Sequence, residues 1–421
     1  MYFRILARIK AALATPWKRN LYILFFAQVM TAVGFSSIFP FLPLYVKSLN
    51  SSTGLSVEFL SGMVFSSQGI AMMIASPIWG SLADRFGRKM MVERAMFGGA
   101  IILSLMGLVR TSEELILLRA LQGLITGTVA AANALVAASA PKQQTGYAMG
   151  LLQVAMSSGI AVGPVIGGAF AELYGYRSSF FLTGALLFLA GILVLFGVKE
   201  NFKREENVTK KKTGFRSSWG DILSSSGVIP AYGMRFISQL GRASIIPIAP
   251  LFIATLVPAE NQLNLFTGLV IGVSAFTSTV SAVYLGRLGD RIGHRKILIA
   301  SMAAAALIYL PQSMVTAGWQ LLVLQALAGV TLGGIIPSIS ALLARFSRPG
   351  LEGAVYGLDN SIDAGARSLA PLLGSGLAVW LGMRATFTGT AVLYLIGAIL
   401  AAWHLPRFQG YNINQQELPA D

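Results

Sequence analysis

The chain of 421 residues contains no cysteine and only two histidines. Without cysteine it forms neither disulfides nor thiolate metal sites. His294 and His404 fall near the ends of hydrophobic segments, so a histidine-rich metal centre is excluded as well. Charged residues make up only 12% of the chain, whereas about 25% is usual in a soluble domain. The composition argues against a soluble enzyme, and we expect no catalytic residues, no metal and no cofactor.

Long hydrophobic blocks take the place of the missing charge. Hydrophobic residues make up 55% of the chain, and the mean hydropathy is +0.68. A helix needs about 20 apolar residues to cross a bilayer, and every span must be helical because lipid satisfies no exposed backbone polar group. We predict an all-α membrane protein with twelve transmembrane helices at 20–46, 58–82, 90–109, 114–139, 145–172, 177–197, 228–256, 265–286, 296–315, 318–344, 352–380 and 384–404.

The net charge of +15 is distributed as a topology signal. Of the 32 Lys and Arg residues, 24 fall on one side of the predicted spans, 4 on the other and 4 inside them. Such a bias places the basic side in the cytoplasm, facing anionic lipid. We therefore expect both termini in the cytoplasm of a protein of the cytoplasmic (inner) membrane, with lipid as a partner and no nucleic acid.

The spans and the polar stretches between them predict the domain organisation. Residues 1–19 carry an apolar face and bases, which fits an interfacial amphipathic helix. A six-helix bundle at 20–197 is followed by a basic cytoplasmic linker at 198–227. The second six-helix bundle spans 228–405, and 406–421 form a cytoplasmic tail.

Three motifs recur about half a chain apart. Each pair has nearly the same offset, 206 or 207 residues: Gly34-x5-Pro40-x2-Pro43 with Gly241-x5-Pro247-x2-Pro250, Gly80–Lys89 with Gly286–Lys296, and Gly175-Tyr-Arg177 with Gly382-Met-Arg384. The chain is therefore predicted to be a duplicated six-helix unit. Units with an even number of spans are parallel repeats about an axis along the membrane normal, and they enclose a site near the midplane.

The loop between the second and third predicted spans carries a specific pattern of Gly, Asp and bases. A basic loop alone would follow from the charge bias, but this pattern occurs twice. It resembles the loop signature of the major facilitator superfamily, and the resemblance covers almost the whole chain. In that family the loop is a cytoplasmic latch between the halves. The resemblance assigns that role to Gly80, Asp84, Arg85, Gly87, Arg88, Lys89, Asp290 and Arg291. His294 replaces an arginine in the second copy.

The fifth predicted span is rich in glycine. Small residues four apart let helices approach closely, and a proline bends the helix. Ordinary bundle packing is the alternative explanation. The pattern resembles a hinge of the antiporter branch of the superfamily, formed here by Gly159, Gly163, Pro164, Gly167 and Gly168. The Gly34–Pro43 pattern in span one resembles a motif of the twelve-span drug:proton antiporter branch. Arg119-x2-Gln122-Gly123 in span four resembles the arginine motif of the superfamily, which is linked to proton transfer.

Six charged residues lie well inside the predicted spans, where charge is costly and usually functional. At about 100° per residue, Arg235, Gln239 and Arg242 share roughly a 60° arc, and Asp359, Asp363 and Arg367 share roughly 80°. We hypothesise a ladder of ion pairs between these two helices. The alternative is that Asp363 and Arg367 only neutralise each other. Candidate proton-coupling residues are Asp359, Asp363, Arg367 and Arg119, and candidate substrate-cavity residues are Arg235, Gln239, Arg242, Gln122, Asn133 and Asn360.

Together these features predict a proton-coupled secondary transporter that exports small amphiphilic compounds or drugs by alternating access, working as a monomer. Span one lacks the acidic residue common in drug:proton antiporters, and the buried charges sum to +2, so anionic substrates have equal standing. Two alternatives stay open: an importer, by proton symport or uniport, of a small anionic metabolite, and a signalling or scaffold protein with a transporter fold. No nucleophile–histidine pair supports an enzyme.

Overall fold

The computed structural model describes residues 15–141, 144–200, 227–257, 262–346 and 352–406. The predicted N-terminal amphipathic segment up to residue 14, most of the linker and the tail from residue 407 lie outside this part of the chain. The described residues form α-helices joined by short turns, so the all-α prediction is confirmed.

The described residues of the first half of the chain form α2 (Pro16–Ser37), α3 (Leu42–Ser48), α4 (Val57–Phe86), α5 (Arg88–Met106), α6 (Ser112–Ile125), α7 (Thr128–Ser139) and α8 (Thr145–Gly197). The second half contains α10 (Val228–Ser244), α11 (Ala249–Leu256), α12 (Leu263–Ile292), α13 (His294–Gln312), α14 (Gly318–Phe346), α15 (Glu352–Leu381) and α16 (Met383–His404).

Every predicted span coincides with a helix or with part of a broken one. Spans one, four and seven are pairs of helices, and α8 contains spans five and six on either side of Gly175, which has φ +81°. By length and composition, six described helices can each cross a membrane, or seven if α10 and α11, bent by 41°, count as one. The chain is thus a multi-pass membrane protein.

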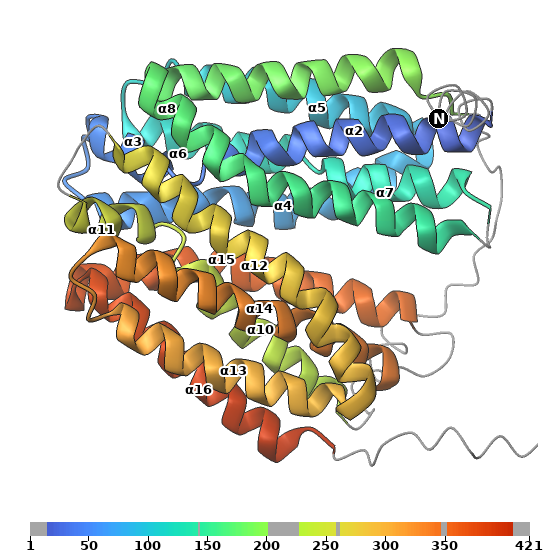
Figure 1. The fold of residues 1–421 in the computed structure, drawn as a ribbon. Helices are drawn as coiled ribbons and strands as arrows, with labels where there is room; N and C mark the ends of the chain where they lie inside the picture. The colour runs from blue at the N-terminus through green and yellow to red at the C-terminus, as the bar shows by residue number, and fades with distance from the viewer. Residues whose placement is uncertain (1–14, 142–143, 201–226, 258–261, 347–351, 407–421) are drawn as a thin grey trace, which may run out of the picture.

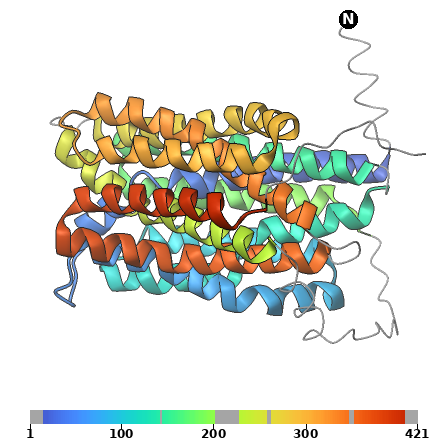
Figure 2. The same cartoon turned by 90° about the horizontal axis from the view of Figure 1, so that it is seen from below.

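The helices form two bundles that lie side by side (Figure 1). Helices α2–α8 pack around hydrophobic cores drawn only from the first half of the chain, and α10–α16 pack around a core drawn only from the second. Seen from below, the long helices of both bundles run along one common direction (Figure 2). Helix α2 begins and α16 ends at the same end of the molecule, which we call the terminal side; the opposite end is the far side.

The repeat holds at the level of individual hydrogen bonds. Gly34 packs against Thr183, whose hydroxyl donates to the Gly34 carbonyl over 3.3 Å. In the second bundle Gly241 packs against Thr390, whose hydroxyl donates to the Gly241 carbonyl over 3.4 Å. The breaks after Ser37 and Ser244 follow at the same offset, where prolines remove backbone donors. The duplicated motif therefore builds two equivalent broken helices.

The third duplicated motif ties helix ends together. Gly175 and Gly382 have φ values of +81° and +87°, which an L side chain rarely adopts, so each makes the turn into the next helix. Arg177 then donates to the Val109 carbonyl over 3.1 Å. Arg384 donates to the carbonyls of Ser313 and Val315 over 2.7 and 3.0 Å. These arginines satisfy carbonyls beyond the ends of α5 and α13, which have no partner within those helices.

Replacing Arg384 by Ala is expected to lower the thermal stability of the detergent-purified protein. The change removes two charge-assisted hydrogen bonds, and we expect a loss of about 1–2 kcal/mol. Arg110→Ala is the matched control, because Arg110 is also exposed and its side chain makes no hydrogen bond or ion pair with the described residues. Equal melting temperatures for the two variants would contradict the capping role.

Candidate functional site

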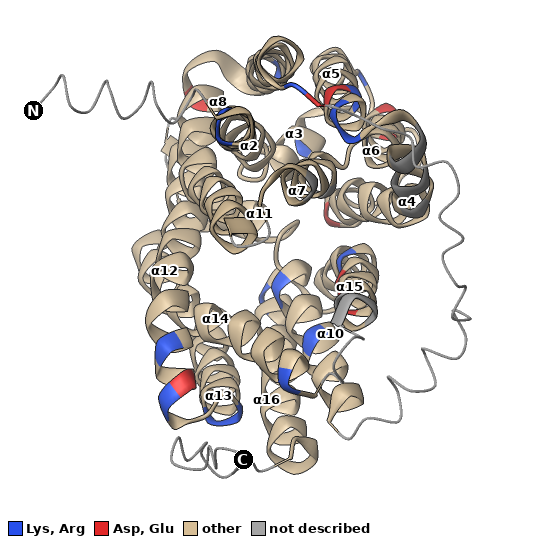
Figure 3. Ribbon diagram, turned by 90° about the vertical axis from the view of Figure 1, so that its right-hand side faces the viewer, with Lys and Arg blue, Asp and Glu red and all other residues tan. Residues whose placement is uncertain are grey.

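Helices α10 and α15 hold the hypothesised ladder of charges between them. The Arg235 Nε lies 3.5 Å from Asp359 Oδ1 and 3.4 Å from Asp363 Oδ1. Arg367 Nε donates to Asp363 Oδ2 over 2.7 Å. In the view along the bundles, α10 and α15 lie side by side in the second bundle, and α15 faces α4 of the first (Figure 3). Arg235 therefore pairs with both carboxylates, which are buried, whereas Arg242 forms no ion pair with the described residues.

The two carboxylates differ in how well they are satisfied. Asp363 contacts two guanidinium groups, one through a short hydrogen bond. Asp359 is only 4% exposed, and its Oδ1 accepts no hydrogen bond from the described residues. Burial disfavours a carboxylate that lacks hydrogen bonds. Asp359 is therefore the better placed of the pair to take up and release a proton.

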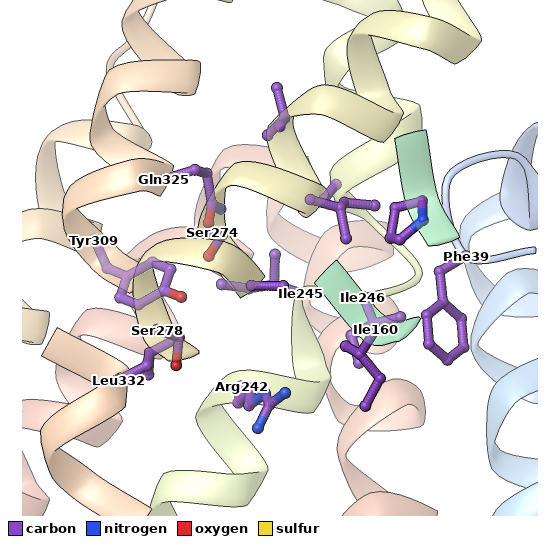
Figure 4. Close-up of a pocket in the computed structure, with 15 residues that line it drawn as sticks. Phe39, Ile160, Arg242, Ile245, Ile246, Ser274, Ser278, Tyr309, Gln325 and Leu332 are labelled. Atoms are coloured by element: carbon purple, nitrogen blue, oxygen red, sulfur yellow. The ribbon is translucent and has the colours of Figure 1, made fainter. Parts of the chain in front are cut away.

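A cavity of about 160 Å³ lies between the bundles, beside the breaks in spans one and seven (Figure 4). The first bundle contributes only Phe39 of the α2–α3 break and Ile160 and Pro164 of α8. The rest of the wall comes from the second bundle. It is apolar except for Arg242, Ser274, Ser278, Tyr309 and Gln325.

Of the six predicted substrate-cavity residues, Arg242 is the one that lines this cavity. Arg235 belongs to the ladder, and Gln122 bonds to Arg119. Gln239 is buried on α10, Asn133 is half-buried on α7 and Asn360 is exposed on α15. Their roles as cavity residues stay predictions.

Arg119 lies apart from the ladder, inside the first bundle. Its side chain is fully buried, with Nη1 donating to Gln122 Oε1 over 2.8 Å and the guanidinium 5.4 Å from the Phe65 ring centre. The Nε and Nη2 atoms of Arg119 have no hydrogen-bond partner among the described residues. No Asp or Glu among those residues forms an ion pair with Arg119. The role of Arg119 in proton transfer stays a prediction.

The predicted latch residues make local contacts where their side chains are described. The structure does not describe the side chains of Asp84 and Arg85, nor the surroundings of Gly80. After the turn at Gly87, with φ +94°, the amides of Arg88 and Lys89 donate to the Glu200 carboxylate over 3.1 and 2.8 Å. In the second copy, Asp290 lies 3.0 Å from His294 of the same loop, and Arg291 is exposed. A latch between the halves therefore stays a prediction.

The glycines of span five divide between two partners. A Cβ at Gly159, Gly163 or Gly167 would overlap α2 of the same bundle, near Ala32, Ser36 and Ser37. Gly168 instead lies against the Asn264 carbonyl of α12, and Gly268 of α12 lies against the Pro164 carbonyl. One face of the motif thus holds the first bundle together, and the other face contacts the second bundle.

The contacts between bundles lie toward the far side. Gly168 and Pro164 meet the start of α12, where the Glu172 carboxylate accepts a hydrogen bond from the Asn264 amide over 3.0 Å. Across the interface, Gly62 of α4 packs on Ser375 of α15. Because α4 begins, and α15 ends, on the far side, these contacts close that end of the interface.

Sequence reasoning missed most of the cavity wall. Tyr309 and Gln325 could have been recognised from the sequence as cavity candidates, because they are polar side chains within apolar spans. Gln325 also donates a hydrogen bond to Gln312 over 3.1 Å. Ile245 and Ile246 carried none, because nothing in the sequence separates an isoleucine that faces a cavity from one that faces lipid.

Known proteins resemble this chain along nearly its full length. The sequence profile of the Major Facilitator Superfamily matches residues 24–234 and again residues 231–419. "Multidrug resistance protein MdtG" of Enterobacter lignolyticus is 36% identical over 406 residues, 96% of each chain. The protein of that name from Yersinia enterocolitica is 36% identical over 93% of this chain and 94% of its own.

Two solved structures share the fold. A mutant of the nucleoside transporter NupG superposes with a TM-score of 0.76 at 13% identity, covering 91% of this chain and 99% of its own. A bacterial homolog of the human lysosomal transporter Spinster, inward-facing and unoccupied, has a TM-score of 0.73 at 13% identity, covering 91% and 96%.

Proposed function

This chain belongs to the major facilitator superfamily, and on that premise we propose that it exports small amphiphilic compounds, drugs among them, in exchange for protons. The observation that carries the proposal is the pair of buried carboxylates on α15, Asp359 and Asp363, which Arg235 of α10 bridges inside the second bundle. The relatives named as multidrug resistance proteins support export.

The mechanism follows from the position of these groups. Helix α15 carries both carboxylates and also packs on α4 of the other bundle, so rocking of the bundles changes which side of the membrane reaches them. A proton on Asp359 leaves Arg235 paired with Asp363 alone, which weakens the bridge between α10 and α15. Substrate binding and proton release then alternate. Arg119 and Gln122 would act on the same cycle from the first bundle.

The membrane placement belongs to the same proposal. The charge bias of the loops puts the terminal side in the cytoplasm, so the far-side contacts close the outer end of the interface. We place the chain in the cytoplasmic membrane as a monomer in contact with lipid, divided at the 198–227 linker into two six-helix domains.

Transport in liposomes tests the proposal. With an acidic lumen, an antiporter accumulates an amphiphilic dye as protons leave, whatever the orientation of the inserted protein. A symporter accumulates the dye only when the outside is acidic, and a uniporter ignores the gradient. Accumulation driven by an acidic lumen is expected, whereas accumulation driven by an acidic exterior would show a symporter. Uptake to equilibrium that is the same under both gradients would show a uniporter, and no uptake above that of protein-free liposomes would favour a scaffold.

A further inference from the structure

We infer that the cavity selects amphiphiles with an anionic group and that Arg242 determines this selectivity. The inference rests on the proposed function only in treating the cavity as the substrate site. Among the described residues, Arg242 is the one charged side chain in the cavity wall, and Figure 4 shows it at one end of the group of lining side chains.

Arg242 is the arginine of α10 that lacks a partner. Arg235, two turns earlier, faces two carboxylates, and Arg367 holds Asp363 at 2.7 Å. Among the described residues, Arg242 makes no hydrogen bond and no ion pair, although its side chain is accessible from the cavity. Because Arg242 is exposed, its donors are open to a ligand, and a guanidinium bonds an anion about twice as strongly as a neutral group. The unpaired donors therefore point to a ligand that supplies the missing negative charge.

The charges around Arg242 also favour an anionic ligand over a cationic one. Arg367 and Asp363 both act electrostatically on Arg242, but Asp363 is already bonded to Arg367 and faces Arg235. Tyr309 and Tyr394, neutral phenols, are the other titratable groups acting on Arg242. No carboxylate lines the cavity among the described residues, so an ammonium ligand would meet Arg242 without compensation. Like charges at close range repel each other.

The rest of the wall suits the apolar body of such a ligand. Ile160, Ile245, Ile246 and Phe39 line the cavity around Arg242, and the Ser278 hydroxyl supplies a further donor. A planar guanidinium binds a carboxylate, sulfonate or phosphonate through two parallel hydrogen bonds. The chemistry thus fits an acid of one of these classes attached to an aromatic or aliphatic body.

Matched fluorescent ligands test the selectivity without any pH gradient. Dansylglycine is an anion and dansyl-ethylenediamine a cation on the same aromatic body. Binding to the purified protein in phosphatidylcholine nanodiscs is followed by energy transfer from its six tryptophans, with empty nanodiscs subtracted. We expect the anion to bind at least about tenfold more tightly than the cation, and Arg242→Gln to remove this difference.

Two further variants decide the outcome. Arg242→Lys should keep part of the preference, because it keeps the charge but not the fork of donors. Arg287→Gln, which removes an exposed charge on α12 away from the cavity, should keep all of it. Equal binding of the two ligands, no binding of dansylglycine, or an unchanged preference in folded Arg242→Gln would overturn the inference. Failure of proton-driven transport alone would overturn the proposed exchange and leave this selectivity standing.

Discussion

Asp359→Asn is expected to reduce proton-driven dye accumulation to the rate of protein-free liposomes. Asparagine has nearly the same shape as aspartate, but its amide does not ionise and so cannot take up and release a proton during transport. Arg235 stays paired with Asp363 at 3.4 Å, so the variant should fold. Substrate exchange without a pH gradient should continue, because binding does not require this carboxylate. The measurement is dye accumulation with an acidic lumen, beside dye counterflow at equal pH.

Two companion variants separate proton transfer from structure. Asp359→Glu keeps a carboxylate and should keep part of the driven transport. Asp363→Asn removes the partner of Arg367 and one of the two carboxylates facing Arg235, so we expect it to lower thermal stability, which Asp359→Asn should not do. Because the Arg367 side chain is 60% exposed and Arg235 keeps Asp359 as a partner, solvent screening limits this loss to about 1 kcal/mol. Undiminished accumulation by Asp359→Asn would move the coupling site elsewhere.

Gly168→Val is expected to abolish transport while the protein still folds. The new side chain would overlap the Asn264 carbonyl of α12, which lies in the other bundle. Overpacking of this kind costs about 1–3 kcal/mol, so the far-side-closed state should lose about tenfold in population relative to the far-side-open state. Because the chain has no cysteine, a single Ser274→Cys in the cavity wall reports which side is open.

Labelling of that cysteine in whole cells by a membrane-impermeant maleimide should rise about tenfold in Gly168→Val. The matched control is Gly167→Val, one residue earlier, whose side chain would overlap Ser37 of α2 within the same bundle. We expect this control to be poorly folded and low in yield. Similar labelling with and without Gly168→Val would mean that this contact does not hold the far side closed.

The sequence was sufficient to predict the elements and their duplication. Hydrophobic runs have the length of a membrane, and Gly34 with Gly241 and Gly175 with Gly382 recur at one offset, so every predicted span has a helix. The pairing of Arg235 with Asp359 was also predictable, because the two residues carry opposite charges and lie at similar depths on parallel helices. Spacing along one helix face was enough to identify both groups.

The cavity wall and the division of the span-five glycines were not predictable. Gly167 and Gly168 are adjacent and chemically identical, and only the positions of α2 and α12 decide which bundle each contacts. Arg242 was predicted as a cavity residue, but so were Gln239 and Asn360, which lie outside the wall. Helical spacing gives a direction from an axis, whereas a cavity depends on how neighbouring helices bend.

The ionisable cluster belongs to one copy of an internally duplicated chain. At the offset of 207 residues, the positions of Arg242 and Arg367 are occupied by Phe35 and Ile160 in the first copy. The two copies therefore differ, because the second carries charged residues at these positions and the first carries apolar ones. Substitutions in the second copy should change the substrate specificity. Substitutions in the first copy should mainly change the rate at which the two bundles rock between their two arrangements.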